Sequence, residues 1–300
     1  MYVISCKGLT KNFGRVKAVN DLSFTIEENR ITGLIGPNGA GKTTLLKIIA
    51  GFMRASSGQV TVFSEDPFNS LKVSSNLIFV DEHMKFPSSL SLAEILLSAA
   101  AFYENWDMEL AKGLFDYFSL DPGQQHRYLS KGMKSTFNMI IGLAARCPLT
   151  IFDEPTAGMD AGVRKDFYRA LLRDYLRKPR NIIFSSHLLG EVEDILEDIL
   201  LLQDGKKRLH LPISDLKEFA VALRGKKETV FELTAGQEIY YQKSVGKDHC
   251  YIVIRRDAAD GILKKSSASG VEILPVKADD LCVYLTNKNR GGIDDVFDRD

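Results

Sequence analysis

The sequence lacks three features that would narrow its class at once: closely spaced cysteines, an excess of charge, and a long apolar run. The four cysteines are Cys6, Cys147, Cys250 and Cys282. No two of them form a C-x-x-C pair, which argues against a zinc site or a disulfide framework. Thiols dispersed in this way favour a reducing compartment, and we expect the chain to be cytoplasmic.

Charge is balanced, with 39 lysine plus arginine and 39 aspartate plus glutamate residues. This balance gives no global reason to expect a nucleic-acid partner or direct attraction to an anionic membrane. No stretch reaches the roughly 18–20 apolar residues of a membrane-spanning helix. The best candidate, Leu90 to Tyr103, is short and contains Glu94, and residues 1–12 show no secretory signal. If the chain works at a membrane, another chain has to cross it.

The first part of the chain predicts an α/β core. Alternating apolar residues predict strands, at Val3–Cys6, Leu22–Ile26 and Val60–Val62, with turns at 20–21 and 28–29. A short apolar run, Ile31–Ile35, leads into a glycine-rich loop and then a helical pattern over Lys42–Ala50. A strand, a glycine loop and a helix in this order are typical of phosphate-binding α/β proteins.

A helical insertion is predicted at about residues 88–146, where the apolar period becomes helical. Short apolar strands are then predicted at Leu149–Phe152, Asn181–Phe184 and Ile199–Gln203. Helices are expected between them, at Ala161–Leu176 and Gly190–Leu196, as a parallel sheet requires. Residues 1–208 are therefore expected to form one domain.

The remainder, residues 209–300, is expected to be a small α+β appendage. Lysine-rich turns separate strand-like runs at Val230–Leu233, Tyr251–Ile254 and Val271–Leu274. No catalytic or metal-ligand cluster lies between Lys226 and Pro275. Contact within a dimer, contact with a partner, and regulation all remain open as its role.

The sharpest motif spans Gly36–Thr43 and matches G-x-x-x-x-G-K-[ST]. Its glycines let backbone N–H groups wrap anionic phosphates, which a Cβ would obstruct. Lys42 should reach the β- and γ-phosphates, and Thr43 should place its hydroxyl on Mg²⁺. The predicted nucleotide-binding residues are Gly36, Asn38, Gly39, Ala40, Gly41, Lys42, Thr43 and Thr44. A chance match in a glycine turn is the alternative, and the flanking strand and helix argue against it.

A second motif is the apolar strand Leu149–Phe152 followed by Asp153 and Glu154. Acids at the end of a buried strand are costly unless they meet a cation or a polar ligand. Asp153 fits a Mg²⁺ role, direct or through water, and Glu154 fits the base that polarises the attacking water. An Asp-Glu pair alone is equally typical of a helix N-cap, but the phosphate loop favours the catalytic interpretation.

These motifs and their order resemble ABC ATPases. The strand, its two acids and Pro155–Asp160 resemble the Walker B motif and D-loop of that family. Leu129–Met133 resembles its signature sequence, and Ser185–His187 resembles its switch-histidine loop. The resemblance covers residues 1 to about 208. It implies a P-loop NTPase core of ABC type with an antiparallel β subdomain and a helical insertion, with ATP and Mg²⁺ as ligands and ATP hydrolysis as the activity.

The resemblance also implies residue roles. Phe13 would stack on adenine, although a core position is the alternative, and His187 would contact the γ-phosphate. Ser130 and Gly132 would contact a γ-phosphate held by a second subunit, so the active form would be a homodimer or a pair with a sister subunit. Asp160 would lie at that interface. The other histidines are expected to be structural or exposed: His83, His126, His210 and His249.

Two motifs depart from the common family pattern. The signature carries Lys131 and Met133 in place of glycine and glutamine, a version found in an exporter-type branch of bacterial ATPases that includes YtrB-like subunits. Glu82 stands where the family usually has glutamine; it could bind Mg²⁺ or a water, or be merely solvated. The segment Ala278–Thr286 resembles the short helix that closes many exporter-type subunits, and any amphipathic terminal helix is the alternative.

The favoured function is the ATPase subunit of an ABC transporter, driving a separate transmembrane permease. Such a subunit would be cytoplasmic and peripheral at the inner face of the cell membrane through that permease, which would dock near residues 82–90. A soluble ABC ATPase is the alternative, as is a low-turnover, ATP-gated regulatory module not coupled to transport. The branch suggests export, and the transported substrate would be selected by the permease.

Overall fold

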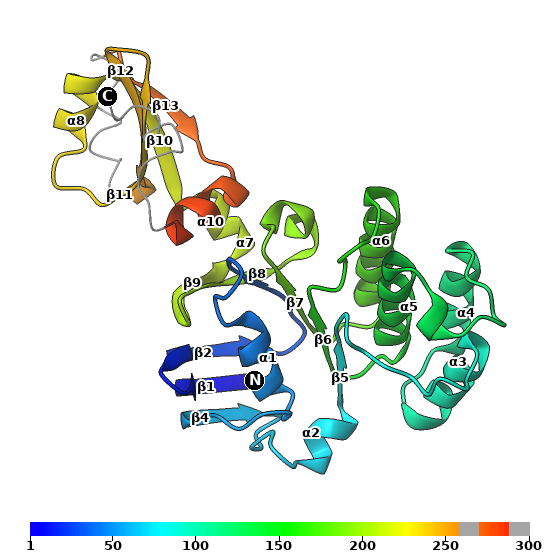
Figure 1. The fold of residues 1–300 in the computed structure, drawn as a ribbon. Helices are drawn as coiled ribbons and strands as arrows, with labels where there is room; N and C mark the ends of the chain where they lie inside the picture. The colour runs from blue at the N-terminus through cyan, green and yellow to red at the C-terminus, as the bar shows by residue number, and fades with distance from the viewer. Residues whose placement is uncertain (258–269, 288–300) are drawn as a thin grey trace. The chain divides into compact units, whose positions relative to one another are not determined.

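The computed structural model describes residues 1–257 and 270–287. The chain divides into two units, Met1–His210 and Leu211–Asp300. Figure 1 shows the helices and strands of each unit. The predicted domain limits, residues 208 and 209, stay predictions. Among the described residues, no helix combines the length and apolar composition that crossing a membrane requires.

The first unit begins with an antiparallel sheet in the order β2-β1-β4. Its strands are β1 (Tyr2–Phe13), β2 (Val16–Glu27) and β4 (Ser57–Val62). These strands are longer than the sequence predicts. Register shifts interrupt the pairing of β1 with β2, and each shift changes which residues face the core. The alternation of apolar and polar residues, on which the prediction depends, therefore persists only over short stretches. The turn predicted at residues 20–21 is wrong, since both residues lie within β2.

The central sheet of this unit has six strands in the order β5-β6-β7-β3-β8-β9. They are β3 (Ile31–Ile35), β5 (Leu77–Val80), β6 (Leu149–Asp153), β7 (Asn181–Ser186), β8 (Asp198–Gln203) and β9 (Lys206–Pro212). The neighbouring strands from β5 to β8 pair in parallel. Parallel strands bring their carboxyl ends to one edge, so the polar loops after β3, β5, β6 and β7 are gathered there.

Helices flank this sheet, and α3, α4 and α5 lie together beside it (Figure 1). The helices are α1 (Lys42–Ile49), α2 (Leu71–Ser75), α3 (Leu92–Phe102), α4 (Met108–Tyr117), α5 (Lys131–Ala144) and α6 (Ala161–Arg177). A one-turn 3₁₀ segment, His126–Tyr128, precedes α5. The three helices α3 to α5 form the predicted insertion between β5 and β6.

The helix predicted at Gly190–Leu196 is wrong. Two 3₁₀ turns stand there instead, Leu189–Glu191 and Glu193–Ile195. Val192 between them has φ −121° and ψ −7°, outside the helical region, so the turns do not join.

The second unit is an antiparallel sheet with strands in the order β11-β12-β10-β13. The strands are β10 (Ala220–Lys226), β11 (Ile239–Val245), β12 (His249–Arg255) and β13 (Glu272–Pro275), and the helices are α7 (Ile213–Lys217), α8 (Lys227–Leu233) and α10 (Ala278–Thr286). The strand predicted at Val230–Leu233 is wrong, because those residues end α8. Val230 is fully buried there against sheet residues such as Leu223 and Ile252. The predicted terminal helix is α10.

Candidate nucleotide site

The glycine loop between β3 and α1 folds tightly against neighbouring backbone. Gly41 has φ 99°, a conformation that L side chains rarely adopt. A Cβ at Gly41 would lie 2.1 Å from the carbonyl oxygen of Ala18, and one at Gly36 would lie 2.4 Å from that of Leu202. Both positions therefore require glycine, and the loop keeps its N–H groups free of side chains on that side.

Lys42 begins α1 and folds its side chain back under the loop. It is 6% exposed, and its Nζ donates to the carbonyl oxygens of Gly36 at 2.7 Å and Pro37 at 3.3 Å. The same ammonium group lies 3.3 Å from Glu154 Oε1. A buried cation beneath a glycine-rich loop at the start of a helix is an arrangement that suits a polyphosphate.

Asp153 ends β6 and is 5% exposed. Its carboxylate accepts hydrogen bonds from Ser185 Oγ, at 2.5 Å, and from the hydroxyl of Thr43. Burial raises the pKa of Asp153, and the charges of Glu154 and Asp81 act in the same direction, while the two hydroxyls oppose them. The contact of a hydroxyl with a carboxylate beside a phosphate loop fits the oxygen ligands that Mg²⁺ prefers.

Glu154 lies between the two other predicted catalytic residues. Its backbone has φ 47°, a strained conformation for a non-glycine residue, and its N–H donates to Ser185 Oγ at 2.9 Å. Oε2 lies 3.0 Å from His187 Nδ1, on the loop after β7, and Oε1 lies 3.3 Å from Lys42 Nζ. The structure thus brings Lys42, Glu154 and His187 together from three separate strand ends.

A cavity of about 310 Å³ opens over this loop. Its lining comprises Phe13, Ala18, Asn38, Gly39, Ala40, Gly41, Lys42, Thr43, Thr44 and Glu154. The Phe13 ring is 49% exposed, so it is not a core residue, and Lys11 Nζ lies 5.3 Å from its centroid. An exposed aromatic face at the rim of a phosphate-binding cavity is available for stacking on a base.

Six predicted site residues lie outside that lining. Three of them contact residues that line it, since Gly36 accepts from Lys42, Asp153 from Thr43, and His187 pairs with Glu154. The other three are Ser130, Gly132 and Glu82. Ser130 caps α5 by accepting from the N–H of Met133 at 3.3 Å, and Gly132 packs closely against Gly158. Glu82 Oε2 lies 2.7 Å from Lys131 Nζ, and this hydrogen-bonded ion pair lowers the pKa of Glu82. The structure therefore leaves these three positions outside the cavity that Lys42 and Glu154 share.

Sequence reasoning missed Asp81 and the role of Ser185. Val80 pairs with Phe152 in the parallel sheet, so the next residues, Asp81 and Asp153, follow side by side. The negative charge of Asp81 is one of the influences that raise the pKa of Asp153. Asp81 follows a short apolar strand, as Asp153 does. This similarity points to a shared site only when the two strands are known to be neighbours in the sheet. Ser185 Oγ donates to the Asp153 carboxylate and accepts from the Glu154 N–H. Its position beside the switch histidine in the sequence does not indicate these two contacts.

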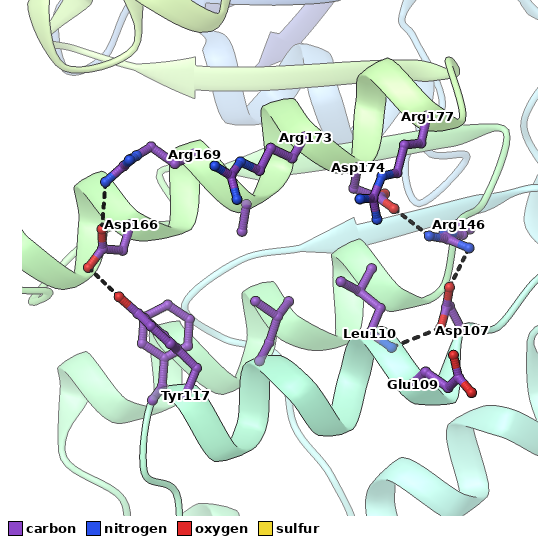
Figure 2. Close-up of a pocket in the computed structure, with 13 residues that line it drawn as sticks. Asp107, Glu109, Leu110, Tyr117, Arg146, Asp166, Arg169, Arg173, Asp174 and Arg177 are labelled. Atoms are coloured by element: carbon purple, nitrogen blue, oxygen red, sulfur yellow. Dashed lines mark hydrogen bonds and ion pairs between the residues drawn. The ribbon is translucent and has the colours of Figure 1, made fainter.

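A larger cavity, of about 530 Å³, lies between α4 and α6 and contains none of these motifs (Figure 2). Its charged lining residues are Asp107, Glu109, Asp166 and Asp174 with Arg146, Arg169, Arg173 and Arg177. Arg146 is paired with Asp107 and Asp174, and Tyr117 donates to Asp166 at 2.9 Å. None of the residues predicted for nucleotide chemistry lines this cavity, so we assign the chemistry to the smaller one. In the part of the chain that is described, no group of three or more His, Cys, Asp and Glu residues could hold a metal by itself.

Comparison with known proteins agrees with this geometry. The family model "ABC transporter" matches residues 19–157. The ABC transporter ATP-binding protein YtrB of Bacillus subtilis is 28% identical over 72% of this chain and 74% of its own length. The bacitracin transport ATP-binding protein BcrA of Bacillus licheniformis is 30% identical over 77% of this chain and 75% of its own length.

Solved structures share the fold. The ATP-binding subunit of an ABC transporter superposes with a TM-score of 0.64 at 22% identity, covering 72% of this chain and 92% of that one. A dimeric ATP-binding cassette bound to ADP and Pi superposes with a TM-score of 0.61 at 19% identity, covering 70% of this chain and 98% of that one. Together with the ordered motifs, the sequence similarities show that the chain belongs to the family of ATP-binding subunits of ABC transporters and is an ATPase of that type.

Proposed function

We propose that this chain binds ATP with Mg²⁺ in the cavity over the phosphate loop and that hydrolysis there drives a separate membrane permease. The observation that carries the proposal is the position of Glu154, with Lys42 at 3.3 Å on one side and His187 at 3.0 Å on the other. A carboxylate beside a phosphate-binding ammonium is placed to accept hydrogen bonds from a water next to the γ-phosphate.

Each residue of the site then has a distinct task. The loop amides and Lys42 bind the phosphates, and Phe13 stacks on the adenine. Thr43 and Asp153 would hold Mg²⁺, which would supply positive charge to the bound phosphates. Glu154 orients the attacking water and takes its proton, while His187 donates a hydrogen bond to the γ-phosphate.

The complete site requires a second subunit, either another copy of this chain or a sister chain. Ser130 and Gly132 lie at the N-terminus of α5, a 14-residue helix, where backbone N–H groups and the helix dipole favour an anion. They do not line the cavity of their own chain. A head-to-tail pair would place them on the γ-phosphate bound by the other subunit, with Asp160 at the interface.

Coupling to transport is supported by the relatives, whose names describe them as ATP-binding proteins of transporters. We propose that this chain is likewise cytoplasmic and sits at the inner face of the membrane by binding its permease near residues 82–90. Export is the proposed direction, since one relative that is 30% identical is a Nod factor export protein. ATP binding would close the pair of subunits and product release would open it.

Steady-state ATP hydrolysis, measured over a series of protein concentrations, tests this proposal. We expect turnover per chain to rise with concentration, because two chains share each site. Glu154→Gln should abolish it, whereas Glu228→Gln, an exposed glutamate of the second unit, should leave it unchanged. Turnover that is equal in Glu154→Gln and the wild type would contradict the assigned base. Turnover per chain that is independent of concentration would contradict the shared site.

A further inference from the structure

Two of the positions at which this chain departs from the family pattern contact each other. Lys131 replaces glycine in the signature and Glu82 replaces glutamine in the loop after β5. Lys131 Nζ lies 2.7 Å from Glu82 Oε2, within direct hydrogen-bond distance. The pair therefore joins the start of α5 in the helical insertion to the edge of the central sheet.

The stem of Lys131 passes over the D-loop on its way to Glu82. Gly158 in that loop has φ 81°, and a Cβ there would lie 2.9 Å from Cγ of Lys131. A Cβ at the neighbouring Gly132 would lie 2.5 Å from the carbonyl oxygen of Gly158. The signature and D-loop are thus packed backbone to backbone, and the lysine side chain covers the contact.

Buried hydrogen bonds tie α5 to the same two loops. Asn138, 2% exposed, donates to the carbonyl oxygen of Asp81 at 3.2 Å. Ser135, 4% exposed, donates to the carbonyl oxygen of Ala157 at 2.8 Å. These bonds hold the middle of α5, one turn or more from its N-terminus. The Lys131–Glu82 ion pair connects the first residue of α5 to the loop after β5 as well.

We propose that Lys131 is a positioning residue, whose ion pair with Glu82 and packing on Gly158 fix the signature, the Glu82 loop and the D-loop in one arrangement. The inference rests on the proposed function, because this arrangement presents Ser130 and Gly132 to the nucleotide of a second subunit. It also gives Glu82 a task other than binding Mg²⁺, and leaves Asp81 as the second acid beside Asp153.

The first test measures order in the Glu82 loop without nucleotide. The N–H of His83 donates to Asp81 Oδ1 at 3.0 Å and that of Met84 donates to the Asp81 carbonyl at 3.3 Å, so both amides report on this loop. Lys131→Met keeps a long side chain of similar helix propensity and removes the charge. Since exposed ion pairs contribute modestly, we expect hydrogen exchange of the two amides to accelerate roughly 2- to 5-fold.

Lys72→Met is the matched control. Lys72 also forms an exposed ion pair, with Glu65 at 3.7 Å, and belongs to the short helix α2. It should leave exchange at His83 and Met84 at the wild-type rate. Unchanged exchange in Lys131→Met, or equal acceleration in both variants, would overturn the proposal. Because no nucleotide is present, this result is independent of whether the proposed ATP-driven function holds.

The second test is a double-mutant cycle on ATP turnover with Glu82→Gln, Lys131→Met and the double variant. We expect Lys131→Met to lower kcat roughly 2- to 5-fold with a KM for ATP within about twofold of wild type. The double variant should be no slower than the slower single variant, because either change already breaks the pair. Effects that multiply would overturn the coupling of the two residues. Absence of turnover in the wild type would instead count against the proposed function, and hydrogen exchange would then decide the positioning role.

Discussion

The two units of the chain differ in what they bury. In the first unit, the buried polar residues include Lys42, Asp153 and Ser185, which lie around the carboxyl ends of the central strands. In the described part of the second unit, the buried side chains are almost wholly apolar. Its buried hydroxyl, on Thr234, donates to the carbonyl oxygen of Val230 at 2.8 Å within the same helical turn.

Backbone strain is divided in the same way. Glu154 and Gly41 adopt positive φ beside the phosphate loop, and Gly41 does so against a neighbouring carbonyl. Gly236, Gly246 and Gly270, the positive-φ residues in the described part of the second unit, are turn glycines with open space around them. Strained backbone and buried charge are costly. Among the described residues, every non-glycine residue with positive φ and every buried charged side chain belongs to the first unit.

The largest expected effect is the loss of ATP binding in Lys42→Met. Removing a buried cation from its phosphate partner costs about 2–5 kcal/mol, so affinity should fall at least about 30-fold. Lys227→Met, on α8 of the second unit, is the control and should bind ATP as the wild type does. Isothermal titration calorimetry of the wild type and both variants measures the affinity for ATP. Equal affinities in the two variants would contradict the assignment of ATP binding to the first unit.

Ile252→Ala should destabilise the second unit without affecting nucleotide binding. Ile252 is fully buried in the apolar core of that unit, and truncating such a residue costs about 2–5 kcal/mol. Calorimetry with and without ATP should show one transition lowered, while the ATP-induced stabilisation of the first unit persists. Loss of the ATP response in Ile252→Ala would show that the two units are not independent in this respect.

Two glycine-to-alanine substitutions compare the backbone strain of the phosphate loop with that of a turn in the second unit. Gly246→Ala should lower the free energy of unfolding by about 1–2 kcal/mol, the cost of a left-handed conformation in open space. Gly41→Ala should cost more, about 2–4 kcal/mol, because its Cβ would also meet the Ala18 carbonyl at 2.1 Å. Urea denaturation of both variants provides the measurement, and equal losses would contradict the tight packing of the loop.

The two units are expected to differ least in the reactivity of their buried thiols. Burial raises the pKa of Cys6 in the first unit to about 12, and also raises that of Cys250 in the second. Folding keeps the Cys6 thiol protonated, so its contribution to stability is present below about pH 9, the ordinary pKa of a cysteine thiol, and falls as pH rises towards 12. Both thiols should resist iodoacetamide at pH 8 in the native protein and react in urea. Rapid labelling of either in the native state would contradict its burial.

Local motifs made the first unit predictable. Ile31–Ile35 is a strand with the predicted limits, because an uninterrupted apolar run between a turn and a glycine loop has few alternatives. The ABC-type core follows from the order of several such motifs. The second unit offers no such motifs. Its run Val230–Leu233 predicts a strand from the sequence alone, because a short apolar run fits a strand as well as a helix. There, packing against the sheet decides for a helix.

Contacts between distant segments could not be predicted. The sequence shows Glu82 and Lys131 as two separate departures from the family pattern, and only the fold shows that they form an ion pair. Asp81 was likewise overlooked because its proximity to Asp153 depends on β5 pairing with β6. The error at Gly190–Leu196 has a local cause, since two 3₁₀ turns preserve part of a helical apolar period.

Photolabelling with 8-azido-ATP tests most directly the central claim that the nucleotide binds in the first unit, over the phosphate loop and beside Phe13. After irradiation and digestion, we expect the label on the peptide that contains Phe13, with excess ATP preventing its attachment. Labelling should also fall in Lys42→Met. Label confined to residues 220–255 of the second unit and displaced by ATP would contradict the account.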